Sequence, residues 1–406
     1  MRLKPASLPL IAVMAAILCL GEMATDIFIS SLPTLVAQFD TSIAHAQLTL
    51  GVYMVGFALS QLVWGPVSDR YGRKPPLIAG TLLFLVASAA AGFAPSMNAL
   101  IVLRFLQALG GGAGVVIVLA IIRDMHERDQ AASMLARMGT VIGVSPALAP
   151  VIGGYLLVWF GWRANFAFLA IWAGLTLILI LAVVDETVRS RDMHALRALG
   201  FARNVRSLLR DRTYLGYGVT MVFAFGTFFA FLFASPFVFI EVLGVKTENF
   251  AYLITIQVVG FVGGTLLADR LMHRIGLERL FGCILLLASV AGVTVAALPW
   301  LGISTVATII APMTVFAFCM GFVFPLGTAA ALGPFPHIAG AASSFLGFAQ
   351  SAVGAGIGVL VGLLHDGTVR PMTTTMGLCI LLAGAFYLFL VRGRIAPVEP
   401  GNLSVH

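Results

Sequence analysis

Charged side chains are scarce in this sequence. Asp, Glu, Lys and Arg together make up 10% of its 406 residues, whereas a water-soluble domain carries about 25%. Apolar residues make up 60%, and the mean hydropathy is +1.02. This composition excludes a soluble domain and indicates a protein that crosses a membrane several times. The formal net charge of +7 does not indicate nucleic-acid binding, because the basic residues are not gathered on one soluble face.

Motifs for catalysis, metal binding and nucleotide binding are also missing. The seven histidines have no metal-ligand spacing, and no nucleophile is paired with a base. No G-x-x-x-x-G-K-[ST] segment is present to cradle a phosphate, which argues against an ATP-driven pump. We therefore expect no metal, no cofactor and no enzymatic activity. Four cysteines lie in apolar runs, which predicts packed thiols rather than disulfides: Cys19, Cys283, Cys319 and Cys379.

Long apolar runs dominate what is present. Windows of about 20 apolar residues, the length of a membrane-crossing helix, occur twelve times. The sequence therefore predicts an all-α integral membrane protein with twelve transmembrane helices. The run 304–331 is long enough to be tilted, or broken at Pro325. The predicted spans are 8–31, 44–66, 76–95, 98–122, 131–158, 164–184, 214–241, 249–269, 280–298, 304–331, 339–364 and 373–391.

Basic residues indicate how the chain is oriented. Arg2 and Lys4 precede an apolar run, as in a secretory signal. That run continues to Pro33 without a convincing cleavage site, so we interpret it as a retained helix. Most of the 24 Lys and Arg residues fall on one side of the predicted membrane, which the positive-inside rule assigns to the cytoplasm together with both termini. The four exceptions are Arg104, Arg163, Lys246 and Arg370.

The longest polar stretch divides the chain into two halves. This stretch, 185–213, is rich in arginine and is expected to be a cytoplasmic linker that touches anionic head groups. A specific regulatory role is the alternative. Before it lies a predicted N-terminal six-helix bundle, 1–184, and after it a C-terminal six-helix bundle with a short tail, 214–406.

The two halves carry a weak internal repeat. Gly65 to Lys74 follows the second span of the first half, and Gly263 to Gly276 follows the second span of the second half. Both segments place an acid and basic residues at the end of a helix. Parallel repeats of this kind are a transporter architecture, with the binding site between the halves near mid-membrane.

Two carboxylates lie within the first predicted span. Glu22 and Asp26 are four residues apart, so they share one helix face, one turn from each other. A charge at mid-bilayer costs roughly 2.5–3.5 kcal/mol on insertion scales, and such residues mark ion or substrate pathways. Like charges this close in a low dielectric should leave at least one acid protonated near neutral pH. The pair therefore predicts a proton-handling site.

Three segments resemble the major facilitator superfamily of transporters. Gly65-Pro-Val-Ser-Asp69-Arg70-Tyr-Gly72-Arg73-Lys74 resembles its G-x-x-x-D-R-x-G-R-[KR] loop between spans 2 and 3. Arg104-Phe-Leu-Gln107-Ala-Leu-Gly110 is similar to its R-x-x-Q-G-x-G pattern in span 4, with Ala108 where glycine is usual. Residues 139–154 resemble the Gly/Pro motif of its antiporters. The resemblance implies the major facilitator fold.

The finer resemblance is to drug/proton antiporters of the bicyclomycin-resistance (Bcr/CflA) type. Glu22 is less typical of that type and is similar to the helix-1 glutamate of certain broad-spectrum multidrug exporters, so either acid is a candidate main proton carrier. The resemblance spans nearly the whole chain. The segments that carry it are Thr25–Pro33, Gln47–Leu50, Ser235–Glu241 and Phe335–Ser344.

Residue chemistry and this resemblance together indicate three groups of site residues. Each group also has a structural alternative. Arg104 could be a structural anchor, the phenylalanines could face lipid, and the polar residues could pair with neighbouring helices. The loop charges could set the topology, and the glycines and prolines could serve ordinary helix packing. Proton coupling is expected at Glu22, Asp26 and Arg104. Substrate contacts are expected at Glu22, Asp26, Tyr53, Phe229, Gln257 and Gln350. Gating is expected at Gly65, Asp69, Arg70, Gly72, Arg73, Gly143, Pro146 and Pro150.

These observations predict a proton-coupled secondary transporter that exports drug-like amphipathic molecules by alternating access, driven by the proton gradient. A proton-coupled exporter of sugars, amino acids or nucleosides is the alternative, and it would require more hydroxyl and amide groups in the spans. A receptor or scaffold would require a soluble domain that the sequence lacks. We expect a monomer in the bacterial inner membrane, with small-molecule substrate, protons and lipid as partners and no nucleic acid.

Overall fold

The computed structural model describes residues 8–125, 128–188, 205–335 and 338–391, and within these residues it is built from helices alone. The long helices before the linker are α1 (Leu8–Ile29), α3 (Ile43–Tyr71), α4 (Lys74–Ala91), α5 (Met97–Met125), α6 (Arg128–Phe160) and α7 (Arg163–Val183). Those after it are α9 (Arg212–Pro236), α10 (Thr247–Ile275), α11 (Leu277–Trp300), α12 (Val306–Leu332), α13 (Ala339–Leu363) and α14 (Arg370–Leu390). The predicted all-α architecture is confirmed.

Most of these helices are long and apolar enough to cross a membrane. Within the described residues, eleven meet that condition, and α6 adds a shorter apolar stretch, Ser145–Phe160. Of the two possibilities for 304–331, a tilt or a break at Pro325, the break does not occur, because α12 runs without interruption from Val306 to Leu332 with Pro312 and Pro325 inside it. Its start is fixed by a capping box, in which the side chains of Thr305 and Thr308 satisfy each other's backbone NH groups.

Two short elements were missed by the sequence prediction. Helix α2 (Leu32–Phe39) follows α1 directly, with a proline in its first turn. A π-helical turn, Phe237–Val242, continues α9 beyond Pro236. Neither element is long enough to show a helical hydrophobic period of its own. Both lie next to long apolar runs, so the sequence pattern did not separate them from the neighbouring spans.

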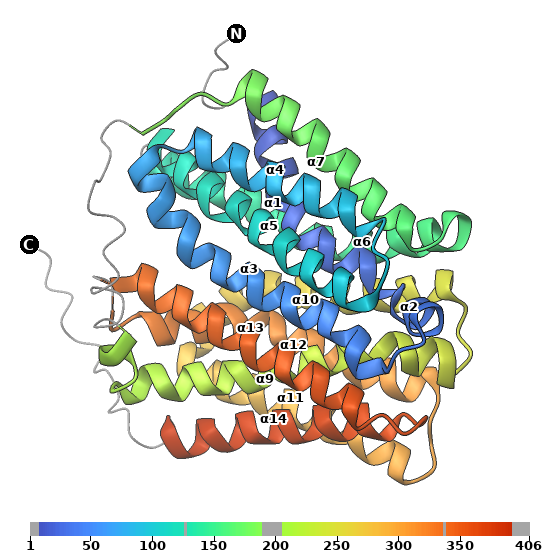
Figure 1. Cartoon of the computed structure of the whole chain (residues 1–406). Helices are drawn as coiled ribbons and strands as arrows, with labels where there is room; N and C mark the ends of the chain where they lie inside the picture. Colours follow the sequence, from blue (N-terminus) through green and yellow to red (C-terminus); the bar gives the residue numbers. More distant parts are fainter. Residues whose placement is uncertain (1–7, 126–127, 189–204, 336–337, 392–406) are drawn as a thin grey trace, which may run out of the picture.

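The helices form two sets that lie side by side in Figure 1, α1–α7 from blue to green and α9–α14 from yellow-green to red. The sets are built alike. In the first, α5 packs against α3 and α4, and α4 packs against α7; in the second, α12 packs against α10 and α11, and α11 packs against α14. We call the end that holds Gly72 and Gly276 the linker end, and the end that holds Gly161 and Gly302 the opposite end.

Two glycines repeat the same turn in the two sets. Gly72 ends α3 with φ +97°, and Gly276 ends α10 with φ +85°. The backbone NH of each donates to the carbonyl four residues earlier, of Ser68 and Met272. Glycine adopts positive φ without the steric cost that a Cβ imposes. The repeat noted in the sequence is therefore present in backbone geometry.

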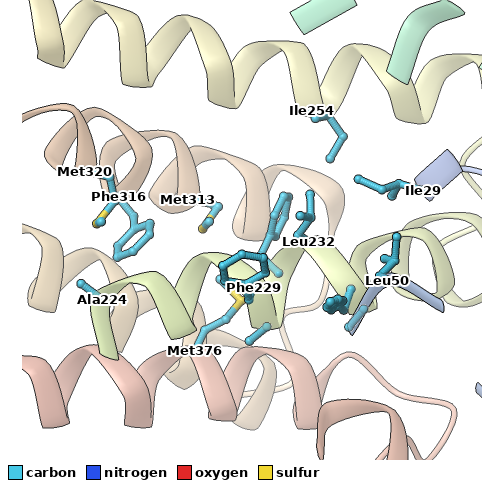
Figure 2. Close-up of a cluster of buried hydrophobic side chains, with 14 of the residues drawn as sticks. Ile29, Leu50, Ala224, Phe229, Leu232, Ile254, Met313, Phe316, Met320 and Met376 are labelled. Carbon is cyan, nitrogen blue, oxygen red and sulfur yellow. The ribbon is translucent and has the colours of Figure 1, made fainter. Parts of the chain in front are cut away.

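The two sets meet near the opposite end. Helix α3 packs against α13, and α6 packs against α10. Side chains from both sets share one apolar cluster there: Figure 2 shows Ile29 and Leu50 of the first set beside Leu232 and Ile254 of the second. Three side-chain hydrogen bonds also join the sets within the described residues. All three lie nearer the opposite end than the linker end.

Candidate functional site

The two acids on α1 occupy one partly exposed stripe. Glu22 and Asp26 are half-buried, and the stripe ends toward the linker end at Leu18 and Cys19, which are buried. It stops one turn beyond Asp26, because Ile29 is completely buried. The structure brings Glu22 and Asp26 within electrostatic range of each other, as their spacing predicted.

The helical turn that carries these acids is clamped by two neighbouring helices. Tyr53 of α3 donates its hydroxyl hydrogen to the Gly21 carbonyl, 2.6 Å away. Arg104 of α5 donates from Nη1 to the Ala24 carbonyl at 2.9 Å. The backbone of α1 is thus fixed on either side of Glu22, which leaves movement mainly to the carboxylate side chains themselves.

Arg104 is held by neutral groups. Its side chain is completely buried, with the guanidinium carbon 4.1 Å from the ring centroid of Tyr53 and 4.9 Å from that of Phe28. Such cation–π contacts stabilise a desolvated guanidinium by up to about 2 kcal/mol. Nη1 also donates to Gln107 Oε1 at 2.7 Å, and Gln107 Nε2 donates to Ser88 Oγ at 2.8 Å.

No ion pair joins Arg104 to either α1 acid in the described structure, where its Nε and Nη2 have no partner. Arg104 therefore lies near the acids, as expected, but it binds the backbone of α1 and not a carboxylate. Two donors remain on a buried cation beside the stripe. An unpaired donor of this kind is costly to bury. Nε and Nη2 are therefore candidates to bind an acceptor in another conformational state of the protein.

Helix α7 adds donors to α1 that sequence reasoning missed. Asn165 Nδ2 donates to the Ile27 carbonyl at 3.1 Å and to Ser31 Oγ at 3.0 Å, and Trp172 Nε1 donates to the Ala16 carbonyl at 3.2 Å. A lone asparagine inside an apolar span was the available signal, since a buried amide requires a partner.

Glycines allow α1 to lie against α5 and α6. A Cβ added at Gly153 of α6 would lie 2.0 Å from the Ile27 carbonyl oxygen, and one added at Gly114 of α5 would lie 2.9 Å from the Ile17 carbonyl oxygen. Both positions therefore require glycine. The neighbouring Gly154 makes only ordinary contacts, 3.6 Å from Ala251 of α10.

The other predicted substrate residues are buried in this structure. Phe229 packs its ring where a Cβ of Gly354 would stand, so it fills the seam between α9 and α13. In Figure 2 its ring lies among the methionines and Leu232 of the second set. Gln257 donates to Thr314 Oγ1 at 3.3 Å and leaves its Oε1 without a partner; Gln350 leaves its Nε2 without one. Their predicted substrate contacts stay predictions.

At the linker end, two of the predicted gating residues, Asp69 and Arg73, form a charge cluster with Asp124. Arg73 pairs with Asp69 one turn earlier and donates from Nε to Asp124 Oδ2 of α5 at 2.8 Å. Arg70 lies 5.4 Å from the ring of Tyr71 and is outside these pairs. Gly65, within α3, has room for a Cβ, which would meet Val116 at 3.7 Å.

Glu186, just after α7, completes this cluster and was not predicted. Its carboxylate accepts hydrogen bonds from the backbone NH groups of Arg73 at 2.8 Å and Lys74 at 3.2 Å, at the start of α4. Burial opposes its ionisation, but the NH donors of Arg73, Val188, Lys74 and Thr187 outweigh that effect, so the pKa of Glu186 lies below its ordinary value. A carboxylate at a helix N-terminus also interacts favourably with the helix dipole.

Helix α6 remains continuous through its Gly/Pro motif. Pro146 and Pro150 both lie inside Arg128–Phe160, Pro150 buried and Pro146 half-buried. Gly143 lies in this helix, but its surroundings are outside the described residues. Thr255 of α10 donates to the Ala147 carbonyl at 3.0 Å, between the two prolines of this motif. This motif therefore forms part of the seam between the two helix sets. Its gating role stays a prediction.

Solved structures with a similar fold are transporters. One is a bacterial homologue of the human lysosomal transporter Spinster, in an inward-facing, occupied conformation, with a TM-score of 0.74, 17% identity, and coverage of 96% of this chain and 98% of that one. Another is a D-xylose–proton symporter, with a TM-score of 0.73, 17% identity, and coverage of 94% and 97%. At this identity the likeness establishes the fold.

Sequence relatives cover the same length. A bicyclomycin resistance protein homolog of Haemophilus influenzae is 29% identical over 385 residues, 93% of this chain and 94% of the relative. Multidrug resistance protein D of Escherichia coli is 29% identical over 381 residues, 92% and 94%. These relatives confirm the resemblance to the bicyclomycin-resistance type. The family model of the Major Facilitator Superfamily matches residues 13–359. The chain therefore belongs to the Major Facilitator Superfamily and is a multi-pass membrane transporter, not an enzyme.

Proposed function

We propose that this chain exports drug-like amphipathic molecules from bacteria in exchange for protons. In this proposal twelve spans form two six-helix halves around the linker 185–213, with both termini in the cytoplasm and the chain in the inner membrane. The names of the relatives, which refer to bicyclomycin and multidrug resistance, support the substrate class. The observation that carries proton coupling is the pair of half-buried carboxylates on a clamped turn of α1.

The structure supports a state that loads from the linker end. The two helix sets meet near the opposite end, where α3 packs against α13 and α6 packs against α10. Substrate would enter from the cytoplasm while the acids are ionised. Rocking of the halves then closes the linker end, and protons from the other side of the membrane neutralise the acids and favour release.

Coupling requires that substrate and proton bias the same two-state equilibrium in opposite directions. We assign this role to the α1 acids because they are half-buried titratable groups on one face of α1. Arg104 contributes a fixed positive charge beside them and two unpaired donors, Nε and Nη2. A carboxylate on the same turn would gain these donors by a side-chain movement, which would link its protonation to the position of α1.

Everted membrane vesicles test this function. Vesicles that contain the chain are energised by respiration, and substrate is added while the internal pH is followed with a fluorescent dye. Bicyclomycin and phenicols are the first substrates to use, with lipophilic cations as a contrast that would implicate Glu22. We expect substrate-induced proton release, and its loss in the double variant E22Q/D26N.

The single variants E22Q and D26N show which acid carries the proton. The variant that loses proton release identifies the main carrier. Proton release that persists when both acids are amides would overturn the proposal. Protection of cells against toxic sugars, amino acids or nucleosides, without protection against antibiotics, would favour the metabolite exporter instead.

A further inference from the structure

A groove lies between α11 and α14 at the linker end. Its volume is about 700 Å³. One wall follows α11 from Glu278 to Ser289, and the other follows α14 from Leu381 to Val391. At a rise of 1.5 Å per residue, each wall is roughly 15 Å long. The hydrocarbon core of a bilayer is about 30 Å thick, so the groove is as deep as one leaflet.

The contacts between α11 and α14 differ in kind along the groove. Nearer the opposite end they touch: a Cβ at Gly292 would lie 2.4 Å from Ile380, and one at Gly377 would lie 2.6 Å from Ala296. Toward the linker end Tyr387 spans the gap, with its hydroxyl donating to the Glu278 carbonyl at 3.2 Å. Gly282 and Gly384 also line the groove, where an added Cβ would lie 3.0 Å from the Tyr387 hydroxyl and 3.3 Å from Ser289 Oγ.

The lining of the groove changes from apolar to charged along its length. Leu286 is 67% exposed and Leu388 is 50% exposed, so both present hydrocarbon to the surrounding bilayer. Cys283 is also exposed here, so its predicted packing as a buried thiol is wrong, whereas the other three cysteines are buried. Among the described lining residues, the charged ones are Glu278 and Arg279, both at the mouth and both exposed.

These two charges are not paired with each other in the described structure. They stand one residue apart in the first turn of α11, at the level where a leaflet has its head groups. One acid and one base make the mouth neutral overall. That pattern is complementary to a head group that carries both a phosphate and an ammonium, and less so to one that carries a phosphate alone.

We propose that the groove binds an aminophospholipid, with the phosphate at Arg279, the primary ammonium at Glu278 and one acyl chain along the leucines. Arginine matches phosphate geometry with several NH donors, and charge-assisted hydrogen bonds are the stronger kind. The site lies on the outer face of the α9–α14 set, apart from the α1 acids. The inference therefore does not depend on what the protein transports.

Lipid counting on the purified full-length chain tests this site. The chain is delipidated in detergent and supplied with phosphatidylethanolamine or phosphatidylglycerol, and bound lipids are counted by native mass spectrometry. We expect one phosphatidylethanolamine to bind, about tenfold more tightly than phosphatidylglycerol. The variants R279Q and A385F should each weaken this binding about tenfold, because one removes the phosphate ligand and the other fills the groove.

Matched controls separate the groove from general lipid effects. R274Q removes an exposed arginine at the same end, and L382F enlarges an exposed side chain of α14; neither residue lines the groove. Both should retain the lipid. Equal retention by R279Q and R274Q, or equal affinity for the two lipids in the wild type, would overturn the proposal.

Cys283 supplies a readout that needs no variant. Because it lies in the groove and is the only exposed cysteine of the four, a membrane-soluble maleimide should label it preferentially. Phosphatidylethanolamine in nanodiscs should slow this labelling severalfold relative to phosphatidylglycerol. E278Q should abolish the difference between the lipids. A labelling rate that does not depend on the lipid would contradict occupancy of the groove.

Discussion

At the residue scale, Arg104 fixes the geometry around the α1 acids. It lies between the rings of Tyr53 and Phe28, and its Nη1 atom binds the Ala24 carbonyl and Gln107. The sequence predicted a buried cation near the acids, but it could not predict these partners. Apart from Gln107, which lies one turn along the same helix, they come from α1 and α3 and depend on tertiary packing, which no local spacing encodes.

Replacement of Arg104 by lysine tests this arrangement. Lysine keeps the charge but lacks the planar fork that contacts a carbonyl and an amide while stacking between rings. We expect R104K to lower stability by about 1–3 kcal/mol and transport at least about tenfold. Thermal unfolding in detergent and vesicle uptake measure the two effects. R123K, at an exposed arginine that ends the same helix, is the control and should change neither.

Glu186 gives a pH dependence at the same scale. Its folded-state pKa is depressed, so it stabilises the fold at pH values above its unfolded-state pKa. This stabilisation is lost as the pH falls through the lower, folded-state pKa. We expect wild type to exceed E186Q in melting temperature at pH 7, and the gap to narrow below about pH 4. A gap that stays constant from pH 7 to pH 3.5 would show that ionisation of Glu186 is not the cause.

At the element scale, close approach between helices rests on single glycines. Apolar windows predicted the long helices because length and hydropathy are local properties. The apolar windows did not distinguish glycines that touch the backbone of a neighbouring helix from glycines that have space for a Cβ. Gly153 and Gly154 are neighbours in the sequence, yet only Gly153 faces the backbone of α1.

This difference yields a matched pair of variants. G153A places a Cβ against the Ile27 carbonyl and should force α6 away from α1, at a cost of about 1–3 kcal/mol. G154A adds a methyl with ordinary contacts and should stay within about 0.5 kcal/mol of wild type. Thermal unfolding in detergent gives both values. Equal destabilisation by the two variants would contradict the described contact between α1 and α6.

At the scale of the whole molecule, contacts between the two helix sets gather near one end. Sequence analysis predicted two halves from the basic linker and the repeat. It could not predict which end is closed, because one sequence must support at least two arrangements of a transporter. The decisive contacts join residues far apart in the chain, such as Gln47 and Phe233.

A disulfide across this seam should arrest the transport cycle. A Cβ at Gly51 would lie 3.6 Å from the Cβ of Ala355, within the range for a disulfide. We expect G51C/A355C, in a background where serine replaces the four native cysteines, to lose transport on oxidation and to regain it on reduction. Either single cysteine variant is the control. Full transport by the oxidised, cross-linked protein would show that this end does not open.

Proton release on substrate binding tests the central claim most directly. Purified protein in weakly buffered detergent solution is mixed with substrate, and the pH change is recorded at several starting pH values. The account predicts that wild type releases protons when substrate binds and that E22Q/D26N binds substrate without releasing any. Equal proton release by the two proteins would contradict the assignment of the coupling site to the α1 acids.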